Sequence, residues 1–98
     1  MTRSELQRLS EEFIRERLRG SLPPGVGVYL FGSRARRTAG WNADYDLWVD
    51  AEVPARIIRE VAEEIDDSFV PFRVDIVTTP DLRGRFADRV KAEAIRWM

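Results

Sequence analysis

The sequence predicts an α/β (α+β) fold, in which a small mixed β-sheet of three or more strands carries helices on one face. Segments with the apolar spacing of amphipathic helices alternate with short apolar runs of strand length. One helical segment lies between two strand segments, and such a unit favours a right-handed crossover that joins parallel strands. The 98 residues, 44% of them hydrophobic, suffice for one modest core, so we expect residues 1–98 to form a single domain.

The chain begins with the pattern of an amphipathic helix over residues 4 to about 19. Its apolar positions recur near helical spacing and are Leu6, Leu9, Phe13, Ile14 and Leu18. Gly20 and the Pro-Pro-Gly sequence at 23–25 end it, because glycine and proline interrupt helices. A strand is predicted over residues 26–31, and since it is apolar on both faces, we expect it to be covered or partnered on each side.

A small and basic loop follows this strand directly. Gly32 has no side chain, so a ligand can approach the backbone there closely. Ser33 can cap a short helix, which leaves N–H groups and a hydroxyl directed outward. The arginines at 34, 36 and 37 add positive charge beside this turn, although arginine is also the usual surface cation of this chain.

The second predicted strand, residues 44–49, carries two aspartates on one face. Side chains alternate along a strand, so Asp44 and Asp46 point the same way, with Cβ atoms about 6.6 Å apart. The apolar residues between and after them point the opposite way. Because aspartate is depleted in strands, the pair requires an explanation. A metal site provides one, since carboxylate oxygens are natural ligands of hard cations such as Mg²⁺.

A helix from Pro54 to about residue 67 leads to a third strand over residues 72–77. In that strand Asp75 lies on the face opposite to Phe72, Val74 and Ile76. If the second and third strands are neighbours, Asp75 joins the other two aspartates on one open face of the sheet, and the helices cover the other face. A last helix is predicted over residues 82–97 from apolar residues at helical spacing.

Composition excludes several kinds of chemistry. The chain has no cysteine and no histidine, which excludes thiol chemistry, zinc sites of the usual type and imidazole bases. The net charge of -1 argues against strong general nucleic-acid binding. No apolar run approaches the ~20 residues of a membrane helix, and the charged first segment is unlike a signal peptide, so we expect a cytoplasmic protein.

Other families with an Asp-x-Asp motif fit less well. An EF-hand loop beginning at Asn42 would need glycine at Leu47 and glutamate at Val53. A phosphatase of the haloacid dehalogenase type usually has a loop threonine or valine where Trp48 stands. The basic loop lacks the lysine of a P-loop, and the glycines miss the dinucleotide spacing. A single aspartate on a strand is usually an ordinary surface residue, as we expect Asp50 to be, so the combination carries the prediction.

The order Gly-Ser-x-Ala-Arg, a short loop, Asp-x-Asp and a later strand aspartate resembles the nucleotidyltransferase superfamily related to DNA polymerase β. More narrowly, it is similar to the minimal nucleotidyltransferases of HEPN/MNT toxin–antitoxin pairs. This resemblance spans nearly the whole chain and implies the polymerase β palm-like nucleotidyltransferase fold. Two positions depart from the family pattern. Family members often have glycine where this chain has Arg37, and serine where it has Ala43.

The resemblance also implies an activity: transfer of a nucleoside monophosphate, AMP from ATP, to a hydroxyl, with release of pyrophosphate. Two Mg²⁺ ions about 3.5–4 Å apart would assist the displacement. The implied catalytic residues and metal ligands are Asp44, Asp46 and Asp75. The implied nucleotide-binding residues, which would hold the phosphates and neutralise the departing pyrophosphate, are Gly32, Ser33, Arg34 and Arg36.

The implied partner is a HEPN-domain RNase toxin that is inactivated when one of its tyrosines is adenylylated, so that the chain acts as an antitoxin. We expect Trp48, on the aspartate face, and Trp41, in the adjacent loop, to be exposed aromatics that suit such a contact, and Trp97 fits either that surface or the core. For each of the three, a place in the core or stacking on a nucleobase is as compatible with the sequence as contact with a partner. Two alternatives stay open. The chain can be a non-catalytic antitoxin that masks its partner by contact, or a transferase that acts on RNA or a small-molecule hydroxyl. The sequence also leaves open whether the chain forms a homo-oligomer.

Overall fold

The computed structural model describes all 98 residues and contains a single four-stranded mixed sheet with helices around it. The elements are α1 (Arg3–Ser21), β1 (Val28–Phe31), α2 (Gly32–Arg36), β2 (Tyr45–Val49), α3 (Ala55–Asp66), β3 (Val74–Thr78), the 3₁₀ helix η1 (Thr79–Asp81), α4 (Gly84–Glu93) and β4 (Ile95–Arg96). The strands lie in the order β3-β2-β1-β4. β2 and β3 are parallel, as the strand–helix–strand pattern predicts, and β1 is antiparallel to both of its neighbours.

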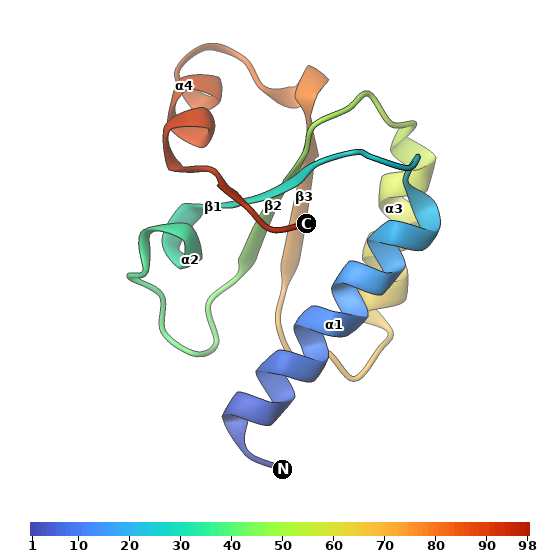
Figure 1. The fold of residues 1–98 in the computed structure, drawn as a ribbon, viewed down its shortest axis with the longest axis vertical. Coiled ribbons are helices and arrows are strands. Elements are labelled where there is room, and N and C mark those ends of the chain that lie inside the picture. The colour runs from blue at the N-terminus through green and yellow to red at the C-terminus, as the bar shows by residue number, and fades with distance from the viewer.

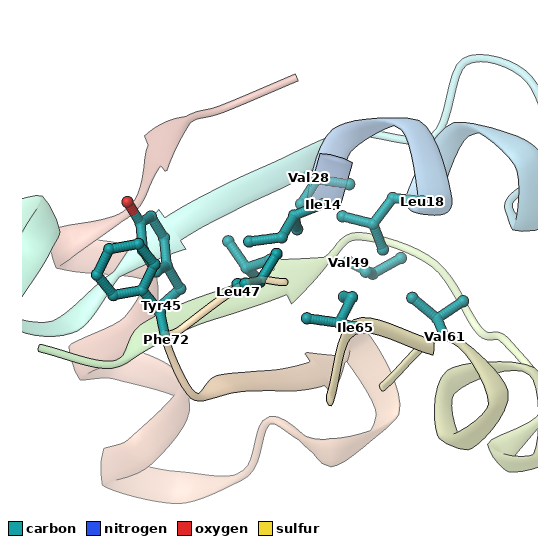
Figure 2. Packing of buried hydrophobic residues seen from close by; sticks show 10 residues of the cluster. Ile14, Leu18, Val28, Tyr45, Leu47, Val49, Val61, Ile65 and Phe72 are labelled. Atoms are coloured by element: carbon teal, nitrogen blue, oxygen red, sulfur yellow. The ribbon is translucent and has the colours of Figure 1, made fainter. Parts of the chain in front are cut away.

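The core lies between the sheet and the two helices α1 and α3, which pack side by side over one sheet face (Figure 1). Alternate residues of β2 point into it, and Figure 2 shows them against apolar side chains from both helices. The buried cluster consists of Ile14, Leu18, Val28, Tyr45, Leu47, Val49, Val61, Ile65, Val70 and Phe72. Each fully buried aliphatic side chain of this kind stabilises the fold by about 1.5–3 kcal/mol, so this face accounts for much of the stability.

α1 has a clear beginning and end in the sequence. The side-chain oxygen of Thr2 accepts a hydrogen bond from the backbone N–H of Glu5, which caps the first turn. The helix ends before the two prolines at 23 and 24, and Gly25 then adopts a φ of +82°, a conformation that favours glycine. The predicted helix and its boundaries therefore agree closely with the structure.

The C-terminal segment differs from the prediction of one helix over residues 82–97. α4 ends at Glu93, and the chain then extends as β4, whose residues pair with Tyr29 and Leu30 of β1. The backbone N–H of Trp97 continues the pairing by donating to Val28 O at 2.8 Å. The free edge of β1 offers hydrogen-bond partners to the last residues, and the apolar spacing of the sequence does not reveal them.

The helices also do not all lie on one face of the sheet. α1 and α3 cover the core face, as expected, but α4 packs over part of the opposite, aspartate face (Figure 1). There Val90 is fully buried in a small cluster with Phe31 and Trp48. The ring of Phe86 lies edge-on to that of Phe31, with 6.1 Å between the ring centroids. The face that the sequence predicts to be open is therefore partly covered by α4.

The tryptophans take part in packing and hydrogen bonding, which corrects the expectation of an exposed aromatic surface. Trp48 is only 9% exposed, and its indole N–H donates to Thr79 Oγ1 at 3.1 Å. Trp41 is half-buried and donates its indole N–H to Arg3 O. Trp97 packs against the main core. None of the helices combines the length and the apolar character needed to cross a bilayer.

Candidate active site

The centre of the candidate site is a pair of aspartates on neighbouring strands. Asp46 of β2 is in register with Asp75 of β3, so the two residues lie directly side by side. Adjacent strands are about 4.8 Å apart, and residues in register on parallel strands point to the same face. Both side chains therefore lie on the face opposite to the main core. β3 begins at Val74 rather than at residue 72, which leaves this pairing unchanged.

Gly32 brings the backbone of the Gly-Ser turn against Asp46 of this pair. Its φ is +75°, in the left-handed region that favours glycine. A Cβ built on Gly32 would overlap with Oδ2 of Asp46. Glycine is therefore required here both for its backbone conformation and because a carboxylate occupies the space of any side chain.

Asp44 lies just before β2 and is exposed, so the strand itself begins one residue later than predicted. Burial raises the pKa of Asp46 above its ordinary value, and the negative charges of Asp75 and Asp44 raise it further. The three carboxylates thus act on one another electrostatically, and the repulsion converges on Asp46. Nearby Arg36 and Arg89 act in the opposite direction but do not reverse the shift.

The three aspartates have the right ligand atoms for a divalent cation, but they do not lie close enough together to hold one. Carboxylate oxygens are hard donors, and a cation would relieve the repulsion that raises the pKa of Asp46. However, no three acidic side chains of the chain come together closely enough to hold an ion as they stand. Asp75 Oδ1 accepts a hydrogen bond from Arg73 Nε at 3.2 Å in an exposed ion pair. Exposed pairs of this kind are weak, so Asp75 can exchange this partner for a metal ion at little cost.

A hollow of about 390 Å³ extends from this pair, and we call it the carboxylate hollow. Its lining residues are Phe31, Gly32, Ser33, Arg36, Asp46, Asp75, Val77, Phe86, Arg89 and Glu93. Its volume falls within the range of small-molecule sites, roughly 300–1,000 Å³. Gly32, Ser33 and Arg36, which the sequence singles out, are thus brought together with Asp46 and Asp75, whereas Asp44 lies outside the lining.

Arg34, which the resemblance places among the nucleotide-binding residues, does not line the carboxylate hollow. Its guanidinium donates hydrogen bonds to Trp41 O at 2.7 Å and to Ala43 O at 2.8 Å. It also stacks over the ring of Tyr45, 4.0 Å from the centroid. Arg34 and Arg36 are two positions apart in the chain, and this spacing directs their side chains to different sides of the short helix α2. Arg34 therefore holds the loop after α2 against the core side of the sheet.

Residues 10–96 match the model of the nucleotidyltransferase domain family. The chain belongs to this family. No curated protein matches the sequence.

Solved structures of toxin–antitoxin pairs share the fold of this nucleotidyltransferase domain. One is a crystal structure of a toxin–antitoxin with AMP-PNP, with 26% identity and a TM-score of 0.73 over 90% of this chain and 72% of that one. Another is a tri-AMPylated Shewanella oneidensis HEPN toxin in complex with its MNT antitoxin, with 24% identity and a TM-score of 0.67 over 94% and 71%. The MntA–HepT toxin–antitoxin has 23% identity and a TM-score of 0.66 over 93% and 71%. The mixed sheet and the nucleotidyltransferase fold predicted from the sequence are confirmed.

Three lining residues of this domain come from α4, and the sequence motif does not include them: Phe86, Arg89 and Glu93. The one sequence signal is their spacing, which places residues 86, 89 and 93 on one side of a helix. That signal predicts a shared face, but it does not indicate that the face is turned toward the aspartates.

Proposed function

We propose that this nucleotidyltransferase domain transfers AMP from ATP to a protein hydroxyl in a Mg²⁺-dependent reaction. The observation that carries the proposal is the pairing of Asp46 with Asp75 beside the backbone of Gly32. This arrangement combines two hard metal ligands with a backbone that a phosphate can approach closely.

The polar groups of the motif in and beside the carboxylate hollow each have a role in this proposal. Asp46 and Asp75, together with Asp44, would hold Mg²⁺, which would supply positive charge that offsets the charge of the phosphates. The N–H of Gly32 and the hydroxyl of Ser33 bind phosphate oxygens, and the guanidinium of Arg36 neutralises charge on the departing pyrophosphate.

The reaction is a displacement at the α-phosphorus of ATP. The acceptor oxygen forms a bond to that phosphorus while the bond from the phosphorus to the bridging oxygen of pyrophosphate breaks. The acceptor hydroxyl loses its proton, and a carboxylate oxygen of Asp75 accepts it, because Asp75 lies on the edge strand of the sheet, where an acceptor can approach it.

We further propose that the acceptor is a tyrosine of a HEPN-domain toxin and that the domain acts as its antitoxin in the cytoplasm. The solved structures with the same fold support this, since one contains an AMPylated HEPN toxin bound to an MNT antitoxin and another contains AMP-PNP. In the structure of the AMPylated toxin, the AMP groups on the toxin are the product expected of such a transfer.

The test is incubation of the purified domain with ATP labelled at the α-phosphate, Mg²⁺ and a HEPN protein encoded beside it. We expect label on a tyrosine of that protein, and its loss with Asp46→Asn or when EDTA removes the metal. Asp66→Asn is the matched control, because Asp66 is an exposed carboxylate on α3, which covers the opposite face of the sheet. Inhibition of the partner without any label would instead identify a masking antitoxin, and label on RNA or a small molecule would identify another acceptor.

A further inference from the structure

Glu93, the last residue of α4, lies where the proposed function places phosphate. Its Oε2 accepts a hydrogen bond from Gly32 N–H at 3.0 Å, and its Oε1 accepts one from Arg36 Nη1 at 2.7 Å. The side chain of Glu93 is only 15% exposed, whereas that of Arg36 is 48% exposed. One carboxylate therefore occupies two of the three groups that are expected to bind an incoming phosphate.

We propose that Glu93 is an internal competitor of the nucleotide, which must displace its carboxylate from Gly32 and Arg36 before the phosphates can bind. This inference depends on the proposed function, because it concerns the same phosphate-binding groups. Glu93 then sets the affinity of the site for triphosphates.

Displacement follows from the number of donors. A backbone amide has a single hydrogen, so Gly32 cannot serve a carboxylate and a phosphate oxygen fully at the same time. A carboxylate and a phosphate are also both negative, so they repel one another at the short distance that sharing these donors would require. The two anions therefore exclude one another.

Glu93 remains an anion under ordinary conditions. Its partial burial acts to raise its pKa, but the hydrogen bond from Gly32 and the hydrogen bond and charge of Arg36 outweigh this and hold the pKa below its ordinary value. The carboxylate is thus charged throughout the neutral range, and competition does not depend on a change of pH.

A second arginine offers the displaced carboxylate another partner. Arg89 lies four residues before Glu93 on α4, a spacing at which oppositely charged side chains meet. It lines the same hollow, and its charge already acts on the carboxylates of both Glu93 and Asp46. A rotation of the Glu93 side chain toward Arg89 therefore frees Gly32 and Arg36 without any movement of the helix.

The test compares Glu93→Gln with the wild type in calorimetric titrations with ATP and with inorganic triphosphate, each in Mg²⁺. Loss of the negative charge should tighten the binding of both by about tenfold, in line with the strength of charge-assisted hydrogen bonds. In transfer assays the KM for ATP should fall while kcat stays nearly unchanged. The matched control is Asp88→Asn, which removes one exposed negative charge from the same helix and should leave both dissociation constants within about twofold of the wild type.

The outcomes separate this inference from the proposed function. If the wild type binds ATP and transfers AMP but Glu93→Gln binds ATP equally or more weakly, Glu93 is not a competitor and only this inference fails. If neither protein binds ATP or triphosphate although circular dichroism shows both to be folded, the proposed function fails as well. Should Glu93→Gln not fold, NMR of the wild type decides. If triphosphate replaces the carboxylate of Glu93, the chemical shift of the Gly32 amide must change when triphosphate is added, and an unchanged shift would contradict the inference.

Discussion

The two faces of the sheet are built from the same strands but follow opposite physical rules. On the core face, Tyr45, Leu47 and Val49 of β2 are almost fully buried against α1 and α3. On the other face, Asp46 of the same strand stands beside Asp75, and burial together with the neighbouring negative charges raises the pKa of Asp46. Burial on the core face stabilises the fold, while the aspartate face brings negative charges together, and a bound cation would reduce the repulsion between them. The comparison indicates that stability and chemistry in this domain are separated by the alternation of side chains along one strand.

The largest effect should come from removing charge on the aspartate face. Asp46→Asn keeps the shape of the side chain but loses a metal-binding charge, so we expect AMP transfer to fall by at least about 10³-fold, the scale of losing a main electrostatic group in an active site. Transfer is measured with labelled ATP, and circular dichroism checks that the fold is retained. A variant that keeps more than a tenth of the wild-type rate would contradict the assigned role of Asp46.

The complementary change is on the core face. Leu47→Ala leaves a cavity beneath β2, so the free energy of unfolding should fall by about 2–5 kcal/mol, as is usual for such truncations. Denaturant unfolding measures it. If the faces are separate, ATP binding by the fraction that remains folded should be nearly unchanged, and a large loss of affinity in the folded variant would show that they are not.

Gly32→Ala should lower both stability and ATP binding, because Gly32 has a left-handed backbone and lies against Asp46. The new Cβ would push against the carboxylate of Asp46, and the φ of +75° is strained for alanine. We expect a stability loss of about 1–3 kcal/mol and loss of ATP binding beyond what the unfolding explains. Thermal melts and calorimetry give the two numbers. Ser21→Ala, at the end of α1 and remote from the hollow, serves as the control.

The two arginines of α2 provide a finer comparison. Arg34→Ala removes hydrogen bonds to two loop carbonyls and a contact with Tyr45, so it should cost about 1–3 kcal/mol of stability. Arg36→Ala should change stability little but weaken ATP binding by about tenfold or more. If both variants show the same loss of affinity at equal folded fraction, the assignment of separate roles is wrong.

The smallest expected effect is on stability and comes from the negative charge of Asp46. Because the pKa of Asp46 is raised in the folded state, its ionised form disfavours folding at neutral pH, and this cost disappears as the pH falls through that raised pKa. In the absence of metal, Asp46→Asn should therefore be more stable than the wild type at pH 7, by less than about 1 kcal/mol. The difference should shrink as the pH is lowered. Mg²⁺ should raise the melting temperature of the wild type more than that of the variant.

Several parts of the fold and of the site could be predicted because they depend on neighbours in sequence. The spacing of apolar residues locates α1 and α3, and the alternation along residues 44–49 separates the aspartates from Leu47. The paired placement of Asp46 and Asp75 follows once the strand–helix–strand unit is taken as parallel. The direction of Arg34 could not be predicted, because it depends on carbonyl groups of a loop whose path is set by packing.

The sequence by itself determined most of the helices and strands, the face on which each β2 residue lies, and the Gly-Ser turn between β1 and the aspartates, since φ/ψ preferences and side-chain periodicity are local. Only the tertiary structure decided that α4 crosses to the aspartate face, that the last residues form β4, and that Glu93 meets Gly32 and Arg36. Those contacts join groups about sixty residues apart in the chain, and their formation depends on strand edges and buried surfaces that exist only after the sheet has assembled.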